Sequence, residues 1–279
     1  MKILITGTNG QVGHALLNTL TEHDLIPITR NECDLTNLNQ IKKTIDYHQP
    51  DLIINPAAYT QVDRAEEEKS LAFQINCDAP KVMAEKAREY GVPFIHFSTD
   101  YVFDGEKRGA YIEADSTNPL GVYGQSKLAG EQAIQTIGGQ SYILRTSWVY
   151  SHIGKNFYLM MKRLSQERDE IKVVSDQLGV PTSNLFIAQQ TQKIISQLSS
   201  ENIGIYHLVP DGQCTWYDFA REIILKTTPT FNINNLLSID TDQYPTKTTR
   251  PKNSVLDNSQ IKSAFMLKFD DWKTELRKL

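Results

Sequence analysis

Short apolar runs alternate with helical patterns through the first half of the chain. β-Branched and aliphatic residues gather at residues 2–6, 25–29, 52–55, 93–98 and 141–146. Helical patterns separate them at residues 38–47, at 70–90 and around 123–127. Such alternation is typical of parallel strands joined by crossover helices, and the nearly continuous apolarity of the strands indicates that both sheet faces are covered. The pattern predicts an α/β fold with a doubly wound parallel sheet of Rossmann type.

The regular pattern is interrupted in two places. Pro80 lies inside the helical pattern of residues 70–90, where proline is expected to kink or restart the helix. After about residue 146 turn-rich stretches separate the elements, and helices are expected near residues 156–166, 184–198 and 216–227. No repeat or linker marks a boundary. We therefore expect one domain over residues 1–150 and a smaller part over residues 151–279 that closes over it, with an uncertain and interleaved boundary.

Composition narrows the class of protein. The 279 residues are 40% hydrophobic with a formal net charge of -4, and the pI near 5.9 does not favour nucleic-acid binding. No apolar run approaches the roughly 18 residues of a membrane span, and no signal segment opens the chain. A cytoplasmic location, without membrane or nucleic-acid partners, is expected. The three cysteines and six histidines lack metal-ligand spacing, so no metal site is expected.

The first apolar run leads directly into a glycine-rich turn. Gly7, Gly10 and Gly13 form a Gly-x-x-Gly-x-x-Gly sequence that encloses Gln11 and Val12 and opens a helix. Glycines let a pyrophosphate approach the backbone, and the helix start offers unpaired N–H groups to it. A tight structural turn is the alternative, but the order strand, glycines, helix favours a dinucleotide. Residues 1–150 are then the dinucleotide-binding domain, and residues 151–279 are mainly substrate-binding.

Tyr123 and Lys127 stand four residues apart, which places them on one face of a helix. A phenol ionises near pH 10, and a neighbouring cation that stabilises the phenolate would bring it closer to proton exchange at neutral pH. Alone, the spacing also occurs on ordinary solvated helices. Together with the glycine turn, it predicts a proton-transfer site.

Two strand ends carry further candidate chemistry. Thr29 and Arg30 follow the second strand where an acid would bind the adenosine ribose, and a hydroxyl beside a guanidinium can accept a 2′-phosphate instead. This favours NADPH, with NADH possible, although Arg30 could be a solvated loop charge. Asp34 and Leu35 could hold the adenine edge. At the fourth strand end, Thr99 could hydrogen-bond the oxygen that Tyr123 protonates, or the hydroxyl could merely cap a turn.

Together these motifs resemble an extended short-chain dehydrogenase/reductase. Within that family the chain is similar to the dTDP-4-dehydrorhamnose reductases over residues 1–272. The matching strings begin at Asn55, Ser98, Asn118, Arg145, Asn156, Asp176, Tyr206 and Arg250. The resemblance implies reduction of the 4-keto group of dTDP-4-dehydro-β-L-rhamnose with NADPH or NADH to give dTDP-β-L-rhamnose. The expected partner is thus a dTDP-sugar.

The resemblance also implies roles for individual residues. Tyr123, Lys127 and Thr99 would be catalytic, with Tyr123 donating the proton to the C4 oxygen. The cofactor would contact Gly7, Gly10, Gln11, Val12, Gly13, Thr29, Arg30, Asp34, Leu35, Ala57, Ala58, Thr60, Tyr123 and Lys127. The substrate would contact Thr99, Asp100, Tyr101, Trp148 and Asn156. From the sequence, Trp148 could equally be a core residue.

Some features leave alternatives open. Some relatives dimerise through magnesium bridged by glutamates, and one of those positions is here Ala15, so a monomer or homodimer is expected and a magnesium-bridged dimer is doubtful. A nucleotide-sugar epimerase or dehydratase on the same scaffold is one rival function. A non-catalytic nucleotide-binding regulatory subunit is the other.

Overall fold

A six-stranded parallel sheet forms the centre of the computed structural model, which describes residues 1–279. The strands lie in the order β10-β5-β4-β3-β1-β2. Their bounds are Lys2–Thr6 (β1), Asp24–Ile28 (β2), Leu52–Asn55 (β3), Phe94–Thr99 (β4), Ser141–Thr146 (β5) and Gly204–His207 (β10). The predicted doubly wound α/β fold is confirmed, and the first five strands lie within a residue or two of the predicted runs.

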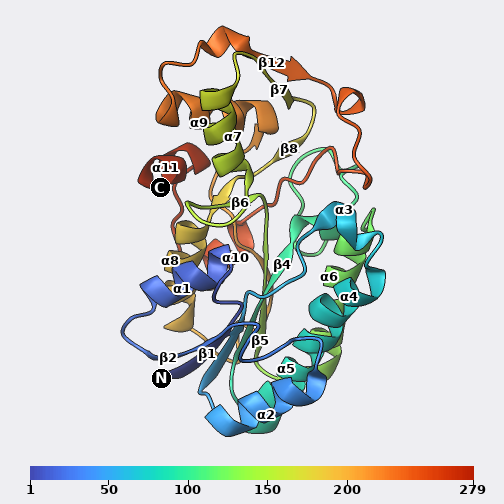
Figure 1. Ribbon diagram of the computed structural model, residues 1–279. Helices are drawn as coiled ribbons and strands as arrows, with labels where there is room; N and C mark the ends of the chain where they lie inside the picture. The colour runs from blue at the N-terminus through green and yellow to red at the C-terminus, as the bar shows by residue number, and fades with distance from the viewer.

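Helices cover both faces of this sheet (Figure 1). One face packs against α1 (Gln11–Thr19), α8 (Asn184–Ile195) and α10 (Ser259–Ala264), and the other against α2 (Leu38–His48), α5 (Ala79–Tyr90) and α6 (Val122–Ile137). Strand alternation divides the side chains between the two faces. In β1, Ile3 and Ile5 join the cluster with α1 and α8, whereas Leu4 joins the cluster with α2, α5 and α6.

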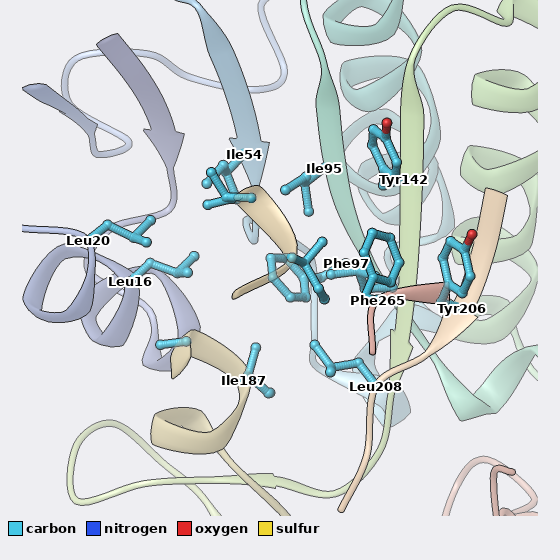
Figure 2. Close-up of a cluster of buried hydrophobic side chains, with 14 of the residues drawn as sticks. Leu16, Leu20, Ile54, Ile95, Phe97, Tyr142, Ile187, Tyr206, Leu208 and Phe265 are labelled. Carbon is cyan, nitrogen blue, oxygen red and sulfur yellow. The ribbon is translucent and has the colours of Figure 1, made fainter. Parts of the chain in front are cut away.

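The apolar clusters supply the main stabilisation of this arrangement. Figure 2 shows the cluster on the α1 face, which includes Leu16 of α1, Ile187 of α8 and Ile54 of β3. All three side chains are fully buried. Burial of an aliphatic side chain of this size contributes about 1.5–3 kcal/mol. The clusters therefore fix the strand ends that carry the candidate site.

The helical pattern of residues 70–90 is restarted, as Pro80 predicted. It forms α4 (Lys69–Phe73), a π-helical turn (Gln74–Asp78) and α5, with Pro80 in the first turn of α5. Within the π turn, the Asn76 amide donates to the Tyr59 carbonyl at 3.1 Å and to the Ser126 hydroxyl at 3.0 Å. The π turn, which the sequence did not predict, thus ties the segment after β3 to α6.

The second half of the chain builds a separate apolar cluster but also returns to the sheet. The predicted helices are α7 (Phe157–Glu167), α8 and α9 (Trp216–Thr227). Of these, α8 packs on α1, and β10 adds an edge to the central sheet beside β5. Two short helices remain, α3 (Val62–Ala65) and α11 (Trp272–Lys278). Three two-stranded pairs are formed by β6 (Val149–Tyr150) with β9 (Thr182–Ser183), β7 (Ile171–Val174) with β12 (Leu236–Ile239), and β8 (Leu178–Gly179) with β11 (Cys214–Thr215). There are also three 3₁₀ turns, Asp100–Val102, Ile233–Asn235 and Thr241–Gln243. None of the helices has both the length and the apolar character needed to cross a bilayer.

A buried ion pair joins β5 to α6. Arg145 donates two hydrogen bonds to the Glu131 carboxylate, from Nε to Oε1 at 2.9 Å and from Nη2 to Oε2 at 2.7 Å. Glu131 is 1% exposed and Arg145 is 2% exposed. Since neither charge reaches water, each depends on the other for its stabilisation.

Replacing one member of this pair is expected to destabilise the protein strongly. The Glu131→Gln variant leaves the Arg145 charge buried without its counter-ion, and the free energy of unfolding should fall by about 3–5 kcal/mol. Urea denaturation followed by circular dichroism measures the loss. The matched control is Glu67→Gln, which removes the exposed pair with Lys247 and should cost about 0–1 kcal/mol. Equal small losses would show that the buried pair contributes no more than the exposed one.

Candidate functional site

The glycine loop between β1 and α1 is as closely packed as a phosphate cradle requires. Gly7 has φ +57°, and a Cβ there would lie 2.8 Å from the Cβ of Ala57. A Cβ on Gly13 would collide with the Gly7 carbonyl oxygen. Gly10 is the N-cap of α1 without a side-chain cap, so the first N–H groups of the helix remain free. Free N–H groups at a helix N-terminus and a loop without side chains fit a diphosphate.

Gln11 anchors this loop to the second half of the chain. Its side-chain oxygen accepts hydrogen bonds from the Ser151 hydroxyl at 2.7 Å and the Asn156 amide at 2.8 Å, and its backbone oxygen accepts one from Asn184 at 3.0 Å. Val12 packs at the edge of the α1 cluster. The loop geometry therefore depends on residues more than 130 positions away.

The side chain of Asn156 makes its hydrogen bonds within the protein. Its Oδ1 accepts from the Leu159 N–H at 3.0 Å as the N-cap of α7. Its Nδ2 donates to Gln11 and to the backbone oxygens of Ser151 and Ile153. Because both ends of the amide are engaged, this side chain acts on the loop through Gln11.

Tyr123 and Lys127 lie in the first turns of α6, which packs against the end of β4. Lys127 is 1% exposed, and its Nζ donates to the Phe97 carbonyl at 2.6 Å and lies 3.2 Å from His96 Nε2. Burial lowers the pKa of Lys127 to about 8, against the opposing effect of Glu131. The lysine is thus held next to the strand and can exchange a proton near neutral pH.

The surroundings of Tyr123 raise its pKa, mainly through burial. A hydrogen bond with Thr99 works in the opposite direction, and Asp100 and Tyr101 add to the rise. The ring of Tyr101 meets that of Tyr123 edge to face, with centroids 5.6 Å apart. In this state the Lys127 nitrogen contacts Phe97 and His96. In this state the phenol stays protonated and suits a proton donor.

Thr99 ends β4 and Asp100 follows it, both close to Tyr123. The Thr99 hydroxyl donates to Asp100 Oδ1 at 2.9 Å and accepts from the Tyr101 N–H at 3.2 Å, so it also caps the short 3₁₀ turn. Burial raises the pKa of Asp100 to about 6. Both readings of the sequence, a cap and a site hydroxyl, are therefore compatible with the position of Thr99.

An acid lies close to the end of β2, where the sequence has Thr29 and Arg30. Glu32 turns back and accepts hydrogen bonds from the Thr29 N–H, at 2.8 Å, and from the Thr29 hydroxyl. These bonds lower the pKa of Glu32, which stays ionised. The spacing of three residues was the signal that went unused. Arg30 is exposed beside this corner, and Asp34 accepts from the Thr36 N–H at 3.0 Å next to the half-buried Leu35.

The segment after β3 lies against the glycine loop. Ala57 and Ala58 are half-buried and Thr60 is exposed. Ala57 meets Gly7, as the close approach described above shows. Small residues at this place leave room beside the loop, which explains why alanines follow the strand.

Trp148 is held in a fixed orientation. Its backbone is left-handed with φ +45°, and its ring stacks on Trp216 with centroids 3.6 Å apart and planes 9° apart. A Cβ on Gly179 would collide with the indole. Trp148 is half-buried, so its ring is supported by Trp216 and still reaches solvent.

Sequence reasoning missed a contact between α3 and the segment of Thr248 and Arg250 near Tyr101. Asp63 of α3 accepts from Arg250 Nη2 at 2.7 Å and from the Thr248 N–H at 3.1 Å. The Arg250 guanidinium lies 5.9 Å from the centre of the Tyr101 ring. The Arg250-Pro251 string was noted without a role, and only the fold brings it to α3.

Comparison with known proteins identifies relatives along the whole chain. The family described as RmlD substrate binding domain matches residues 1–279. The chain is 39% identical over 285 residues to the dTDP-4-dehydrorhamnose reductase of Burkholderia thailandensis, covering 98% of this chain and 96% of the relative. It is 39% identical over 289 residues to that of Escherichia coli, covering 100% and 97%.

The chain is also similar, over nearly its full length, to solved structures of dTDP-4-dehydrorhamnose reductases. The dTDP-4-dehydrorhamnose reductase of Bacillus anthracis in complex with NADP is similar with a TM-score of 0.93 and 34% identity, covering 99% of this chain and 97% of that one. The Clostridium acetobutylicum protein has a TM-score of 0.94 and 38% identity, covering 100% and 98%. A dTDP-glucose 4,6-dehydratase from Streptomyces venezuelae, at 14% identity and a TM-score of 0.80, shares the fold.

Proposed function

We infer the activity of this chain from its family, since it belongs to the dTDP-4-dehydrorhamnose reductases over its full length. It reduces the 4-keto group of dTDP-4-dehydro-β-L-rhamnose with NADPH and yields dTDP-β-L-rhamnose. One observation carries the assignment. Tyr123 and Lys127 of α6 lie beside Thr99, at the carboxyl ends of the strands, where the glycine loop also follows β1. These groups provide a proton and a cradle for a nicotinamide dinucleotide on one edge.

The residues proposed to hold the cofactor lie along the ends of β1, β2 and β3. Gly7, Gly10, Gln11, Val12 and Gly13 would hold the diphosphate with backbone N–H groups. Asp34 and Leu35 would contact the adenine, with Arg30 and Thr29 near the adenosine ribose. The remaining contacts would come from Ala57, Ala58, Thr60, Tyr123 and Lys127. The bound cofactor supplies a hydride to the substrate carbon.

The proton steps are assigned to this chain's own side chains. Tyr123 donates its Oη proton to the C4 oxygen, and the Thr99 hydroxyl hydrogen-bonds that oxygen as charge develops. Lys127 restores the phenol after each turnover. The burial that raises the pKa of Tyr123 favours the protonated donor before reaction. The Thr99 hydroxyl must exchange Asp100 for the substrate oxygen, since it donates to Asp100 in this structure.

The substrate is proposed to lie against the second half of the chain. Trp148 would pack on a sugar face, because its ring is fixed by Trp216. Asp100 and Tyr101 would line the same side of the site as Tyr123. Asn156 contributes indirectly, by holding Gln11.

Several further proposals accompany this function. We expect a monomer or homodimer, and Ala15, which is buried in the α1 cluster, offers no carboxylate for a magnesium bridge. No group of three potential metal-ligating side chains occurs in the structure. The three free cysteines suit a reducing cytoplasm.

One assay separates the reductase from its rivals. Stoichiometric loss of NADPH absorbance on adding the dTDP-4-keto sugar supports the reductase. An epimerase or dehydratase would recycle its nicotinamide and leave the absorbance unchanged, while converting the sugar. A non-catalytic regulatory subunit would bind nucleotide and convert nothing.

Removing the phenol proton should abolish most turnover. Tyr123→Phe keeps the ring but lacks the donor, so kcat should fall about 100-fold or more while the Kd for NADPH changes little. Stopped-flow NADPH oxidation and fluorescence titration measure the two quantities. Tyr217→Phe is the matched control, because that phenol binds the Leu236 carbonyl in the second-half cluster. A Tyr123→Phe enzyme that kept wild-type kcat would contradict the proton-donor role.

Glu32 is expected to limit the preference for NADPH. Glu32→Gln removes a negative charge beside the proposed 2′-phosphate position, so the KM for NADPH should fall, by about 3- to 10-fold. The KM for NADH should not fall, since NADH lacks that phosphate. Glu22→Gln serves as the control, because Glu22 is exposed ahead of the start of β2. Equal changes for both cofactors would place Glu32 away from the phosphate.

A further inference from the structure

The buried amine of Lys127 contacts a polar row that the activity described so far does not use. Lys127 Nζ lies 3.2 Å from His96 Nε2, and His96 Nδ1 lies 3.1 Å from Asn55 Nδ2. The Thr6 hydroxyl lies 2.5 Å from Asn55 Oδ1. The exposed fractions of Thr6, Asn55 and His96 are 2%, 0% and 1%. The row is therefore isolated from water along its length.

The fold places this row across the sheet beneath the site. Asn55 and His96 are register partners on β3 and β4, and Thr6 is the last residue of β1, directly before Gly7. His96 is the third residue of β4, and Thr99 ends the same strand. The row thus links Lys127 to the residue that begins the glycine loop.

When Lys127 is charged, the donors and acceptors of the row can form one arrangement of hydrogen bonds. An ammonium only donates, so His96 Nε2 must accept and Nδ1 must carry the hydrogen. Nδ1–H then needs an acceptor, which is the Asn55 oxygen if the amide is turned by 180°. The orientation of an amide is assigned from its hydrogen bonds. The Asn55 NH₂ then donates to the Thr6 hydroxyl.

A second arrangement fits a neutral Lys127. The amine accepts from His96 Nε2–H, Nδ1 accepts from the Asn55 NH₂, and the Asn55 oxygen accepts from the Thr6 hydroxyl. This is the amide orientation in the structure. In both arrangements Lys127 keeps the Phe97 carbonyl as an acceptor. In each state every hydrogen bond of the row joins one donor to one acceptor, so no buried donor faces another donor.

The ionisable groups around Lys127 leave it close to a balance between these states. Glu131, one helical turn along α6, favours the ammonium, but its charge is shared with Arg145 of β5. Tyr123 precedes it by one turn, and Asp100 lies beyond Tyr123. Burial and the lysine charge hold the pKa of His96 well below its usual range. The imidazole therefore stays neutral and changes tautomer without taking up charge.

We propose that His96 is a positioning residue that holds Lys127 in both its charged and its neutral form while Lys127 returns a proton to Tyr123. This role rests on the proposed reductase activity. During reduction, the Tyr123 Oη–H bond breaks and the alcohol O–H forms. One Lys127 Nζ–H then breaks and the Tyr123 Oη–H re-forms, so the phenolate and ammonium become a phenol and an amine. Solvent protonates Lys127 before the next turnover.

The first test compares two amides at position 96. Gln places its terminal group near the position of Nε2 and can still face Lys127, whereas Asn reaches only toward Asn55. Without an acceptor the ammonium is less stable, so in His96→Asn the alkaline midpoint of kcat should move from near pH 8 to lower pH by about 1 unit. At pH 7, kcat should then fall about 2-fold, and at pH 9 about 10-fold. In His96→Gln both values should stay close to wild type, with NADPH affinity and Tm unchanged.

The second test is direct and needs no substrate. Nitrogen-15 NMR of the histidine rings, with His96 assigned by its loss in His96→Gln, should show a neutral ring whose hydrogen moves from Nδ1 to Nε2 between pH 6 and 10. A single tautomer across that range would overturn the inference, even if His96→Asn failed to fold. An unshifted kcat midpoint in folded His96→Asn would also overturn it. If the wild-type enzyme oxidises no NADPH with active substrate, the reductase assignment fails instead. The NMR result still tests whether His96 changes tautomer.

Discussion

The burial of the Lys127 amine between the sheet and α6 is the constraint on which the rest of the site depends. A charge with 1% exposure must be matched by fixed acceptors. The Phe97 carbonyl supplies one at 2.6 Å, and the His96 ring supplies another. These acceptors lie on β4, so α6 is held at one height above the strand. Tyr123, one turn earlier on the helix, is consequently held over Thr99.

Close packing by glycine makes this constraint possible. A Cβ on Gly124 would collide with the Tyr101 carbonyl oxygen, and one on Gly130 would collide with the Asn76 carbonyl oxygen. The first contact presses α6 against the turn after β4, and the second presses it against the π turn before α5. A larger residue at either place would lift the helix and withdraw Lys127 from its acceptors. The glycine inside the Tyr-x-x-x-Lys stretch is therefore a packing requirement of the site.

Local patterns were enough to predict the parts of the structure that local physics determines. The apolar runs gave five strands of the sheet, Pro80 gave the restart of α5, and the glycine spacing gave a tight loop at a helix start. The sequence did not reveal β10 as a strand of the same sheet or the turn of Glu32 onto Thr29. Strand pairing with a distant segment and the choice of a side-chain rotamer depend on the assembled fold. The same reason hid the Lys127 row, whose members come from three strands.

The interlocking of the two halves follows from the same long-range contacts. The glycine loop belongs to the first half, yet Gln11 is held by Ser151, Asn156 and Asn184 from the second. Since α8 packs on α1 and β10 completes the sheet, the second half stabilises the loop. The predicted boundary near residue 150 therefore does not separate two independent folding units. Because Ser151, which holds Gln11, follows Trp148 by three residues, a shift of that segment would alter the glycine loop and the aromatic surface together.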